Sequence, residues 1–523
     1  MPDRSGFLLS LWDNMPLPGL KGAPEGHGEP VRTLFISDST ALGIMEVRPE
    51  PAWRVRMTGL RNKDLLAPDY GAMHVAAFLK AAGREFRVVN LVADVHARKE
   101  MFYETNAGPD EESGSLISRG EAAAASRAHL FDRLVSENPD VVFVTLSTYN
   151  LALYGRRLLG EIREACPGAK LVTGGIYATM HAPEILADGH ADVVVRGEGE
   201  HTSGELLERL EAGRPLDGLK GVSYRDNGRS LHNPARSPIA DLDALPHPYT
   251  VSEEFEVAAR FEILSELLPD GDWIPGAGFL TSRGCPEACS FCLDPALNNG
   301  RVRFHSPAYV RDVLDFCSQR FTSKAGSFFF GDATFTMNKK RLGRICSMLP
   351  GLPYTYQIQT RADYLDDTTV ELLASSGFTN IAIGAETFNE EILRAVVRKR
   401  LKVQEVLDAA AAVRLSGIKP VLTFIVGLPG ETRDSVWHTL EILKANRLFD
   451  ATFFPLVVFK GTALFDEFAA GTSPGQMEAL RLNPMSEEYL FTSEEFPTAE
   501  ELTVFTREVN YALLASRTAE TAS

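Results

Sequence analysis

The sequence predicts an α/β protein with a parallel sheet in each half of the chain and a small helical cap at the end. The first sign is an alternation of short apolar strands with helices of roughly 10–15 residues, which is typical of βαβ units. The second is a proline-rich interruption at 234–248, after which a new alternation begins at residue 276. With 44% hydrophobic and 24% charged residues, the 523-residue chain has the composition of a packed globular protein.

The first alternation predicts a doubly wound parallel sheet. Its segment 140–146 is a continuous apolar run, as expected for a strand that is buried on both faces. Ligands of such sheets bind at the carboxyl ends of the strands. We expect strands at 33–36, 86–91, 140–146, 169–173 and 192–196, and helices at 70–82, 122–137, 151–165 and 203–212.

The second alternation predicts a partial barrel of about six βα units, of the (β/α)6 type, or a curved parallel sheet. We expect strands at 277–281, 327–330, 355–359, 381–384, 420–427 and 453–458, and helices at 307–320, 338–349, 368–376, 403–416, 434–445 and 499–516. The predicted domains are an N-terminal extension (1–31), a first α/β domain (32–235), a linker (236–275), the partial barrel (276–470) and a helical cap (471–523).

Charge and hydropathy narrow the classes of function. Lys and Arg total 53 against 70 Asp and Glu, a net charge of −17, which disfavours a nucleic-acid partner. No apolar run approaches the ~18 residues that a membrane-spanning helix needs. The short apolar run near the start is flanked by Asp3 and Asp13, so we expect no signal peptide. We therefore expect a cytoplasmic protein that does not enter the membrane.

Three of the six cysteines form the most informative motif, Cys285-Pro-Glu-Ala-Cys289-Ser-Phe-Cys292, directly after the strand expected at 277–281. This spacing places three thiolates on one loop. Zinc normally takes four protein ligands, and His305, the next candidate, lies 13 residues further on. A four-iron cluster held by three thiolates has one iron without a protein ligand, and a small molecule can bind there.

On these residues the chain resembles the radical S-adenosylmethionine (SAM) enzymes. In that family the three cysteines hold a [4Fe-4S] cluster, whose open iron binds the amino and carboxylate groups of SAM. Electron transfer then cleaves SAM to a deoxyadenosyl radical. The resemblance implies that Cys285, Cys289 and Cys292 are the metal ligands and that Phe291 lies in a loop that packs on the adenine.

The resemblance implies further SAM contacts at the ends of barrel strands. Asp332 corresponds to a carboxylate that meets the SAM amine, although it equally suits the N-cap of a helix. Arg361 either faces the barrel mouth or pairs with a surface carboxylate. Glu386 ends a G-x-E strand, where the family's glutamate contacts polar groups of SAM. Lys399 corresponds to a residue that binds the SAM carboxylate, although a basic residue there also suits the C-terminal end of a helix. The turn 427–432 suits architecture better than catalysis, because Gly and Pro supply turn geometry.

In the first domain, Thr173-Gly174-Gly175 follows an apolar strand, and Tyr177-Ala178-Thr179 comes next. On these residues the domain resembles the Rossmann-like cobalamin-binding domain that precedes the barrel in cobalamin-dependent radical SAM enzymes. Glycines after its strands allow a flat ring to approach the backbone. His96 follows Asp94 as in the D-x-H-x-x-G motif of other cobalamin proteins, but Lys99 replaces the glycine, so we interpret His96 as a loop residue. The residues implied on the cobalamin side are Ser147, Thr148, Gly174, Gly175, Thr179, Gly197 and Glu198.

The resemblance implies a C-methyltransferase that uses methylcobalamin and a deoxyadenosyl radical. Its substrate is expected to be an unactivated carbon, or a phosphorus, of a small-molecule or peptide natural-product intermediate, and an electron donor such as flavodoxin or ferredoxin is expected. The two domains must face each other with their carboxyl ends inward, so that both cofactors reach one pocket. No residue is identified as catalytic in itself.

Three alternatives come from other classes. Some cobalamin-dependent relatives catalyse rearrangement or cyclisation without net methyl transfer, and no motif separates these reactions. Methylthiotransferases carry three further cluster cysteines in the N-terminal domain, where this chain has only Cys166. A cobalamin sensor without enzyme activity would lack the cysteine triad. Residues 470–523, with Tyr489 and Phe491, are expected to cover the mouth of the site.

Overall fold

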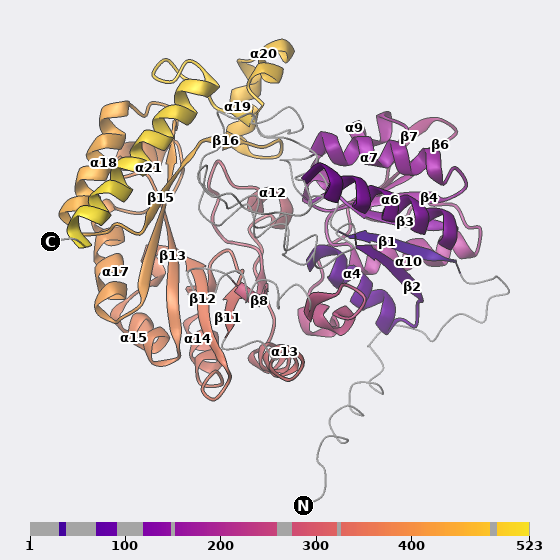
Figure 1. Ribbon diagram of the computed structural model, residues 1–523, viewed down its shortest axis with the longest axis horizontal. Coiled ribbons are helices and arrows are strands. Elements are labelled where there is room, and N and C mark those ends of the chain that lie inside the picture. Colours follow the sequence, from indigo (N-terminus) through magenta and orange to yellow (C-terminus); the bar gives the residue numbers. More distant parts are fainter. Residues whose placement is uncertain are drawn as a thin grey trace, which may run out of the picture.

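The structure is a computed structural model that describes residues 31–37, 70–90, 119–147, 152–258, 275–321, 326–481 and 489–521. The predicted extension before Val31, the segment around His96, Thr148 and the central part of the linker lie outside the described residues. Figure 1 shows the two halves side by side, with the barrel strands and their helices on the left and the N-terminal domain on the right.

The N-terminal domain is a seven-stranded sheet with the order β2-β1-β3-β4-β5-β6-β7. The first five strands in this order are parallel, and β6 and β7 extend the sheet as an antiparallel hairpin. The predicted doubly wound parallel sheet is thus confirmed. The strands are β1 (Thr33–Ser37), β2 (Phe86–Asn90), β3 (Val141–Thr145), β4 (Lys170–Gly174), β5 (Val193–Val195), β6 (Val222–Asp226) and β7 (Arg229–His232).

Both faces of this sheet are buried, because successive side chains of a strand point to opposite sides. On β3, Phe143 joins the core beneath α4 (Tyr70–Ala81) and α10 (Glu200–Glu211), whereas Val144 joins the core beneath α6 (Arg119–Glu137) and α7 (Ala152–Ala165). The continuous apolar run of this strand therefore reflects burial on both sides. Two short helices that we did not predict, α8 (Ile176–Met180) and α9 (Ala182–Ala187), follow β4.

The second domain is a six-stranded, all-parallel sheet with the order β15-β14-β13-β12-β11-β8, which confirms the partial barrel. The strands are β8 (Pro275–Phe279), β11 (Gly326–Phe330), β12 (Tyr354–Thr360), β13 (Phe378–Glu386), β14 (Lys419–Val426) and β15 (Ala451–Pro455). The helices between them are α13 (Pro307–Arg320), α14 (Lys339–Cys346), α15 (Asp367–Ser375), α17 (Val403–Leu415) and α18 (Arg433–Ala445). Helix α14 ends earlier than expected, and the strand expected at 453–458 divides into β15 and β16 (Val457–Val458).

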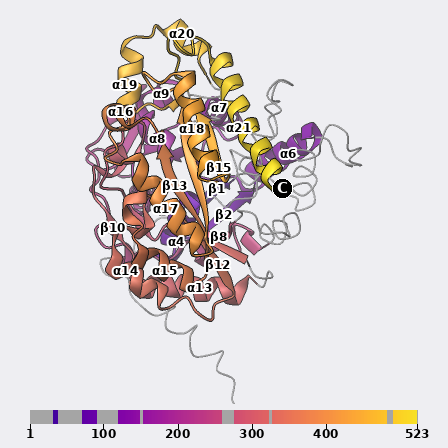
Figure 2. The same cartoon turned by 90° about the vertical axis from the view of Figure 1, so that its left-hand side faces the viewer.

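The last helix, α21 (Ala499–Thr521), covers the open edge of the barrel beside β15 and α18 (Figure 2). The Asn510 side chain accepts a hydrogen bond from the Phe453 amide (3.0 Å) and donates one to its carbonyl (2.9 Å). It therefore pairs both backbone polar groups of this residue on the edge strand. Tyr489 lies in β17 (Tyr489–Leu490), which pairs with β16 just beyond the carboxyl end of β15. Among the described cap residues, β17 thus lies near the mouth, whereas α21 covers the side wall.

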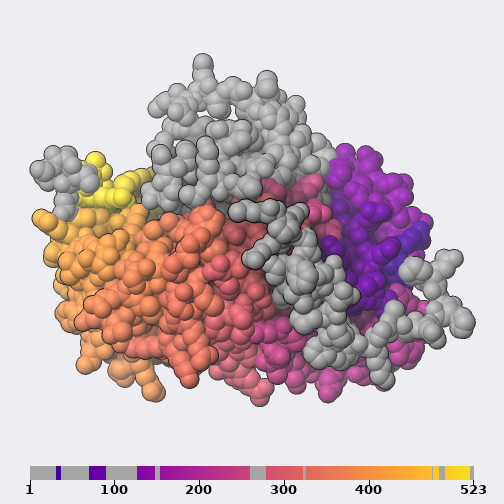
Figure 3. Space-filling view, turned by 90° about the horizontal axis from the view of Figure 1, so that it is seen from below, coloured from indigo at the N-terminus to yellow at the C-terminus, as the bar shows by residue number. Residues whose placement is uncertain are grey.

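The two domains form one continuous body on the face seen in Figure 3. The linker helix η3 (Pro248–Val251) connects their cores: the Tyr249 hydroxyl donates to the Gly278 carbonyl (2.8 Å) and accepts from its amide (3.0 Å) on β8. Tyr70 of α4 lies 3.4 Å from the same hydroxyl. Among the helices described, none is long and apolar enough to span a membrane.

Candidate functional site

The three cysteines lie on the loop between the two-residue strand β9 (Ser282–Arg283) and helix α12 (Asp294–Asn298), and all three thiols are half-buried. The Asp294 carboxylate accepts a hydrogen bond from the Cys285 amide (2.7 Å). The Asp294 amide in turn donates to the Cys292 sulfur (3.5 Å). Asp294 therefore contacts both the first and the last cysteine of the loop.

A glycine makes the start of this loop possible. Gly284 has a φ of +100°, and a Cβ at this position would lie 1.9 Å from the Arg301 carbonyl oxygen. Only glycine fits both the backbone conformation and the close approach. Downstream, the Ser290 hydroxyl donates to the Val396 carbonyl (2.6 Å) and its amide donates to the Val397 carbonyl (3.1 Å), which fixes the loop to the segment that carries Lys399.

The donor set fits an iron–sulfur cluster. Burial raises the pKa of Cys289 to about 11 and also raises the pKa of Cys292. These thiols are therefore protonated without a metal and release their protons when they bind one. Within the described ranges, no three His, Cys, Asp or Glu side chains are placed to hold one metal ion together. Thiolates that each bind a different iron of a cluster need no such convergence.

Asp332, just after β11, is fully buried. Its carboxylate accepts hydrogen bonds from the Thr281 amide (3.1 Å) and hydroxyl (2.9 Å) and from the Ser282 hydroxyl. Burial raises the pKa of this group. The N-cap alternative is wrong, because Asn338 caps the following helix. Asp332 anchors the chain just before the cysteine loop, and its contact with the SAM amine stays a prediction.

Arg361, after β12, is buried and contacts two carboxylates. It donates to the Asp363 carboxylate at 2.8 and 2.9 Å and lies 3.4 Å from the Glu287 carboxylate. Glu287 belongs to the cysteine loop itself, so Arg361 connects a barrel strand to that loop. Phe291, on the same loop, is partly buried against the hydrophobic core.

Glu386 and Lys399 form a buried ion pair beside the cysteine loop. The Lys399 ammonium lies 2.8 Å from the Glu386 carboxylate and donates to the Gly384 carbonyl (2.5 Å). Both charges act on the pKa of Cys289, which places them near that thiol. Glu386 has a φ of +63°, a strained conformation for a residue with a side chain, and such strain is concentrated at functional sites. A Cβ on Gly384 would lie 2.5 Å from the Glu386 carboxylate, so the glycine leaves room for the pair.

Glu431 is a buried carboxylate in the turn that we assigned to architecture. It accepts hydrogen bonds from the Gly427 amide (2.8 Å) and the Thr387 hydroxyl (3.0 Å), and so connects the ends of β14 and β13. Burial raises its pKa to about 7. The signal available in the sequence was an acidic residue directly after a Gly-Leu-Pro-Gly turn. The nearest basic residue along the chain is Arg433, two positions later.

The predicted cobalamin-side residues gather at the carboxyl ends of β3, β4 and β5. Gly175 has a φ of +110°, and a Cβ there would lie 2.6 Å from the Leu146 carbonyl and 2.9 Å from the Ser147 hydroxyl. The Thr179 hydroxyl donates to the Gly175 carbonyl (2.8 Å) and accepts from the Gly197 amide (3.0 Å). Gly174 ends β4 beside Val195. The described part of this edge is thus built from backbone, glycine and hydroxyl groups, and its contact with cobalamin stays a prediction.

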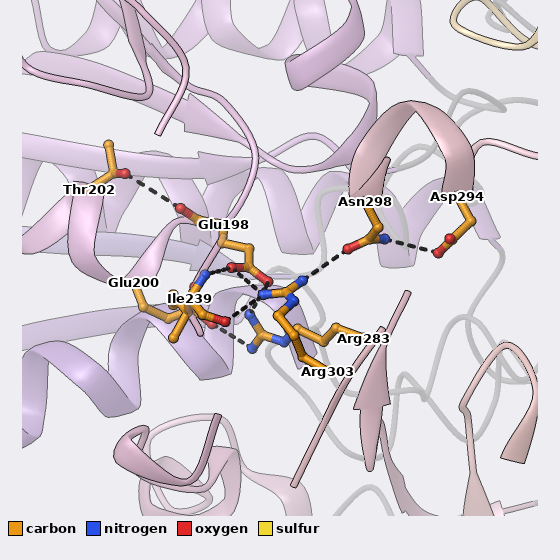
Figure 4. Close-up of polar contacts among 8 residues, drawn as sticks. All are labelled: Glu198, Glu200, Thr202, Ile239, Arg283, Asp294, Asn298 and Arg303. Carbon is orange, nitrogen blue, oxygen red and sulfur yellow. Dashed lines mark hydrogen bonds and ion pairs between the residues drawn. The ribbon is translucent and has the colours of Figure 1, made fainter. Parts of the chain in front are cut away.

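Glu198 differs from the rest of that set, because its carboxylate contacts the barrel domain. It accepts hydrogen bonds from Arg283 (3.0 Å) and Arg303 (2.7 Å), and Glu200 pairs with Arg283 (2.6 Å) (Figure 4). We assigned no role to Glu200, Arg283 or Arg303 from sequence. The available signal was a pair of acidic residues after β5 and a basic residue two positions before Cys285.

Two family models match the chain in the order that the fold suggests. The B12 binding domain model matches residues 60–207, and the Radical SAM superfamily model matches residues 279–443. An uncharacterized methyltransferase of Pyrococcus horikoshii is 28% identical over 371 residues, which cover 68% of this chain and 76% of the relative. The anaerobic magnesium-protoporphyrin IX monomethyl ester cyclase of Rubrivivax gelatinosus is 26% identical over 323 residues, 60% of this chain and 55% of the cyclase.

Among solved structures, the fold is similar to that of TsrM, a radical S-adenosylmethionine methyltransferase of Kitasatospora setae with tryptophan substrate and a SAM analogue bound. The TM-score is 0.64 at 16% identity, and the alignment covers 92% of this chain and 88% of TsrM. At this identity the similarity concerns the fold. The arrangement of an N-terminal parallel sheet followed by an open barrel is therefore one that other proteins share.

Proposed function

We propose that this chain, in which a B12 binding domain precedes a Radical SAM domain, is a cobalamin-dependent radical SAM methyltransferase that methylates an unactivated carbon, or a phosphorus, of a small-molecule or peptide natural-product intermediate. The two domains imply a [4Fe-4S] cluster, SAM and cobalamin as cofactors. When bound, the cluster and SAM supply a radical that activates the substrate, and cobalamin supplies the methyl group.

One observation carries this proposal: loops at the carboxyl ends of both sheets contact each other. Glu198 and Glu200 follow β5, and Arg283 follows β8, yet their side chains are bonded at 2.6–3.0 Å. Ligands of parallel sheets bind at these ends. A substrate at this junction can therefore reach both cofactor sites, as transfer of a methyl group to an activated atom requires.

The barrel residues are suited to the polar part of SAM. We propose that Cys285, Cys289 and Cys292 hold the cluster and that the Glu386–Lys399 pair orients the amino and carboxylate groups of SAM, since the pair offers one charge to each. Phe291, Asp332 and Arg361 shape the same side through the cysteine loop and its anchors.

The other edge is suited to the corrin ring of cobalamin. We propose that Ser147, Gly174, Gly175, Thr179 and Gly197 lie beneath it, together with Thr148, which is outside the described residues. Gly175 packs so closely against the end of β3 that a side chain at this position would collide with Leu146 and Ser147. Glu198 belongs to this loop, although its carboxylate is engaged with the barrel.

The second candidate is a cobalamin-dependent cyclisation or rearrangement, which the similarity to a cyclase of Rubrivivax gelatinosus favours. We propose in either case a cytoplasmic enzyme that receives electrons from a small donor such as flavodoxin or ferredoxin. The substrate of TsrM, tryptophan, is one of the small molecules to try.

The decisive experiment is anaerobic reconstitution with iron, sulfide and hydroxocobalamin, followed by mass spectrometry of the products of SAM. Equal amounts of S-adenosylhomocysteine and deoxyadenosine support methyl transfer, whereas deoxyadenosine alone supports rearrangement. Cys289→Ala should abolish deoxyadenosine formation, because the two remaining thiolates do not hold the cluster in place. Continued cleavage by this variant, or uptake of zinc in place of iron, would contradict the assignment.

A further inference from the structure

A network of largely buried charges, each with a side chain at most 20% exposed, joins the two domains directly beside the cysteine loop. One Glu198 carboxylate oxygen accepts hydrogen bonds from Arg283 (3.0 Å) and Arg303 (2.7 Å), and the other accepts from Arg303 (2.9 Å) and from the Ile239 amide (2.6 Å). The Glu200 side chain, only 4% exposed, pairs with the second terminal nitrogen of Arg283. Two carboxylates thus balance two guanidinium groups.

Figure 4 shows the network continuing from Arg303 through Asn298 to Asp294, which is bonded to the cysteine loop. Arg303 donates to the Asn298 side-chain oxygen (3.0 Å), and the Asn298 amide donates to Asp294 (2.9 Å). Asp294 accepts from the Cys285 amide (2.7 Å), and its own amide donates to the Cys292 sulfur (3.5 Å). Four hydrogen-bonded side chains, those of Glu198, Arg303, Asn298 and Asp294, therefore connect a loop of the N-terminal domain to the loop that carries the cysteines.

The other end of the network reaches the cobalamin-side edge. Gly197, the neighbour of Glu198, donates its amide to the Thr179 hydroxyl (3.0 Å), which is bonded to the Gly175 carbonyl (2.8 Å). Glu198 is therefore the point at which the backbone of one proposed cofactor site meets side chains that hold the other. A displacement of this carboxylate acts on both loops.

Stability alone is a weak reason for such a cluster. Buried ion pairs lose hydration free energy that their attraction barely repays, and apolar residues of similar volume are often as stabilising. What directed, charge-assisted hydrogen bonds supply is a fixed geometry. The planar guanidinium of Arg303 joins Glu198, the Ile239 carbonyl (2.8 Å) and Asn298 in one arrangement.

We propose that Glu198 is a positioning residue that sets the cysteine loop against the cobalamin-side loop. This inference rests on the proposed function, since it takes the two loops as the sites of cluster and cobalamin. It assigns Glu198 a role between the cofactors rather than a contact with the corrin ring. Arg303, Asn298 and Asp294 transmit its position to Cys285.

The test measures the separation of the two cofactors and needs no substrate. Protein reconstituted with iron, sulfide and hydroxocobalamin is reduced so that the cluster and cob(II)alamin both carry an unpaired electron, and pulsed dipolar EPR gives their distance distribution. We expect Glu198→Gln to shift or broaden this distribution by on the order of 1 Å, a displacement large enough to cost much of the rate. Asn298→Ala breaks the network without removing a charge, so it should produce a smaller change in the same direction.

Glu184→Gln is the matched control. Glu184, on α9, pairs across the same two domains with Lys460, but their side chains are 40% and 34% exposed and are not members of the network. This variant should keep the wild-type distribution. Wild-type distributions in both Glu198→Gln and Asn298→Ala would overturn the inference alone. Wild-type protein that takes up no corrinoid would overturn the proposed function and the inference with it.

Discussion

The carboxyl ends of the two sheets differ in the types of residue that line them. In the barrel, the strand ends carry buried charged side chains that are paired or hydrogen-bonded, namely Asp332, Arg361, Glu386 and Glu431. In the N-terminal domain, the charged side chains that follow β5, Glu198 and Glu200, pair with arginines of the barrel domain, and the residues that we propose for cobalamin are glycines and a hydroxyl, namely Gly174, Gly175, Thr179 and Gly197.

This difference matches the ligands that we propose for each edge. A zwitterionic amino-acid group is small and charged, so it is recognised by fixed charges in a site of low dielectric constant. A corrin ring is broad and flat, so it requires an edge that lacks projecting side chains. Charge therefore organises one site and close backbone packing the other, and each can be tested separately.

The largest effect is expected from Lys399→Met, which leaves the Glu386 carboxylate buried without its partner. Breaking a buried pair in this way costs about 3–5 kcal/mol of unfolding free energy. The double variant Glu386→Gln/Lys399→Met removes both charges and should recover most of this loss in urea unfolding. Its SAM affinity, measured by equilibrium dialysis on the reconstituted protein, should remain poor. Full SAM binding by the double variant would show that the pair serves only the fold.

A smaller effect is expected at Glu431, where burial raises the pKa to about 7 from an ordinary value of 4.5. Between these two pH values the folded chain keeps a proton that the unfolded chain releases, so stability falls as pH rises through this window. Glu431→Gln should remove a fall on the order of 2–3 kcal/mol from the pH profile of urea unfolding. Glu441→Gln, at an exposed position on α18, should keep the wild-type slope. An unchanged slope in Glu431→Gln would contradict the assignment.

The sequence predicted both sheets and the cysteine loop because these depend on local patterns. Apolar runs such as 140–146 indicated buried strands, and the spacing of Cys285, Cys289 and Cys292 needs only one loop. The side-chain partners could not be predicted in this way. Arg361 and Glu287 are 74 positions apart, and Glu198 and Arg303 are 105 apart, so their pairing depends on the tertiary fold. Asp332 matched a local capping pattern, yet tertiary hydrogen bonds to Thr281 and Ser282 determine its place.

The smallest effect is expected from Thr179→Val, which tests whether hydroxyl bonds organise the cobalamin edge as charges organise the other. The valine keeps the shape but neither donates to the Gly175 carbonyl nor accepts from the Gly197 amide. Loss of these bonds should cost about 0.5–1.5 kcal/mol of unfolding free energy. Because both partners lie under the proposed ring, hydroxocobalamin affinity should fall as well, by roughly fivefold for each 1 kcal/mol that appears in binding. Thr179→Ser retains the hydroxyl and should bind hydroxocobalamin like wild type in an absorbance titration. Equal affinity in the Val and Ser variants would mean that the glycines alone shape this edge.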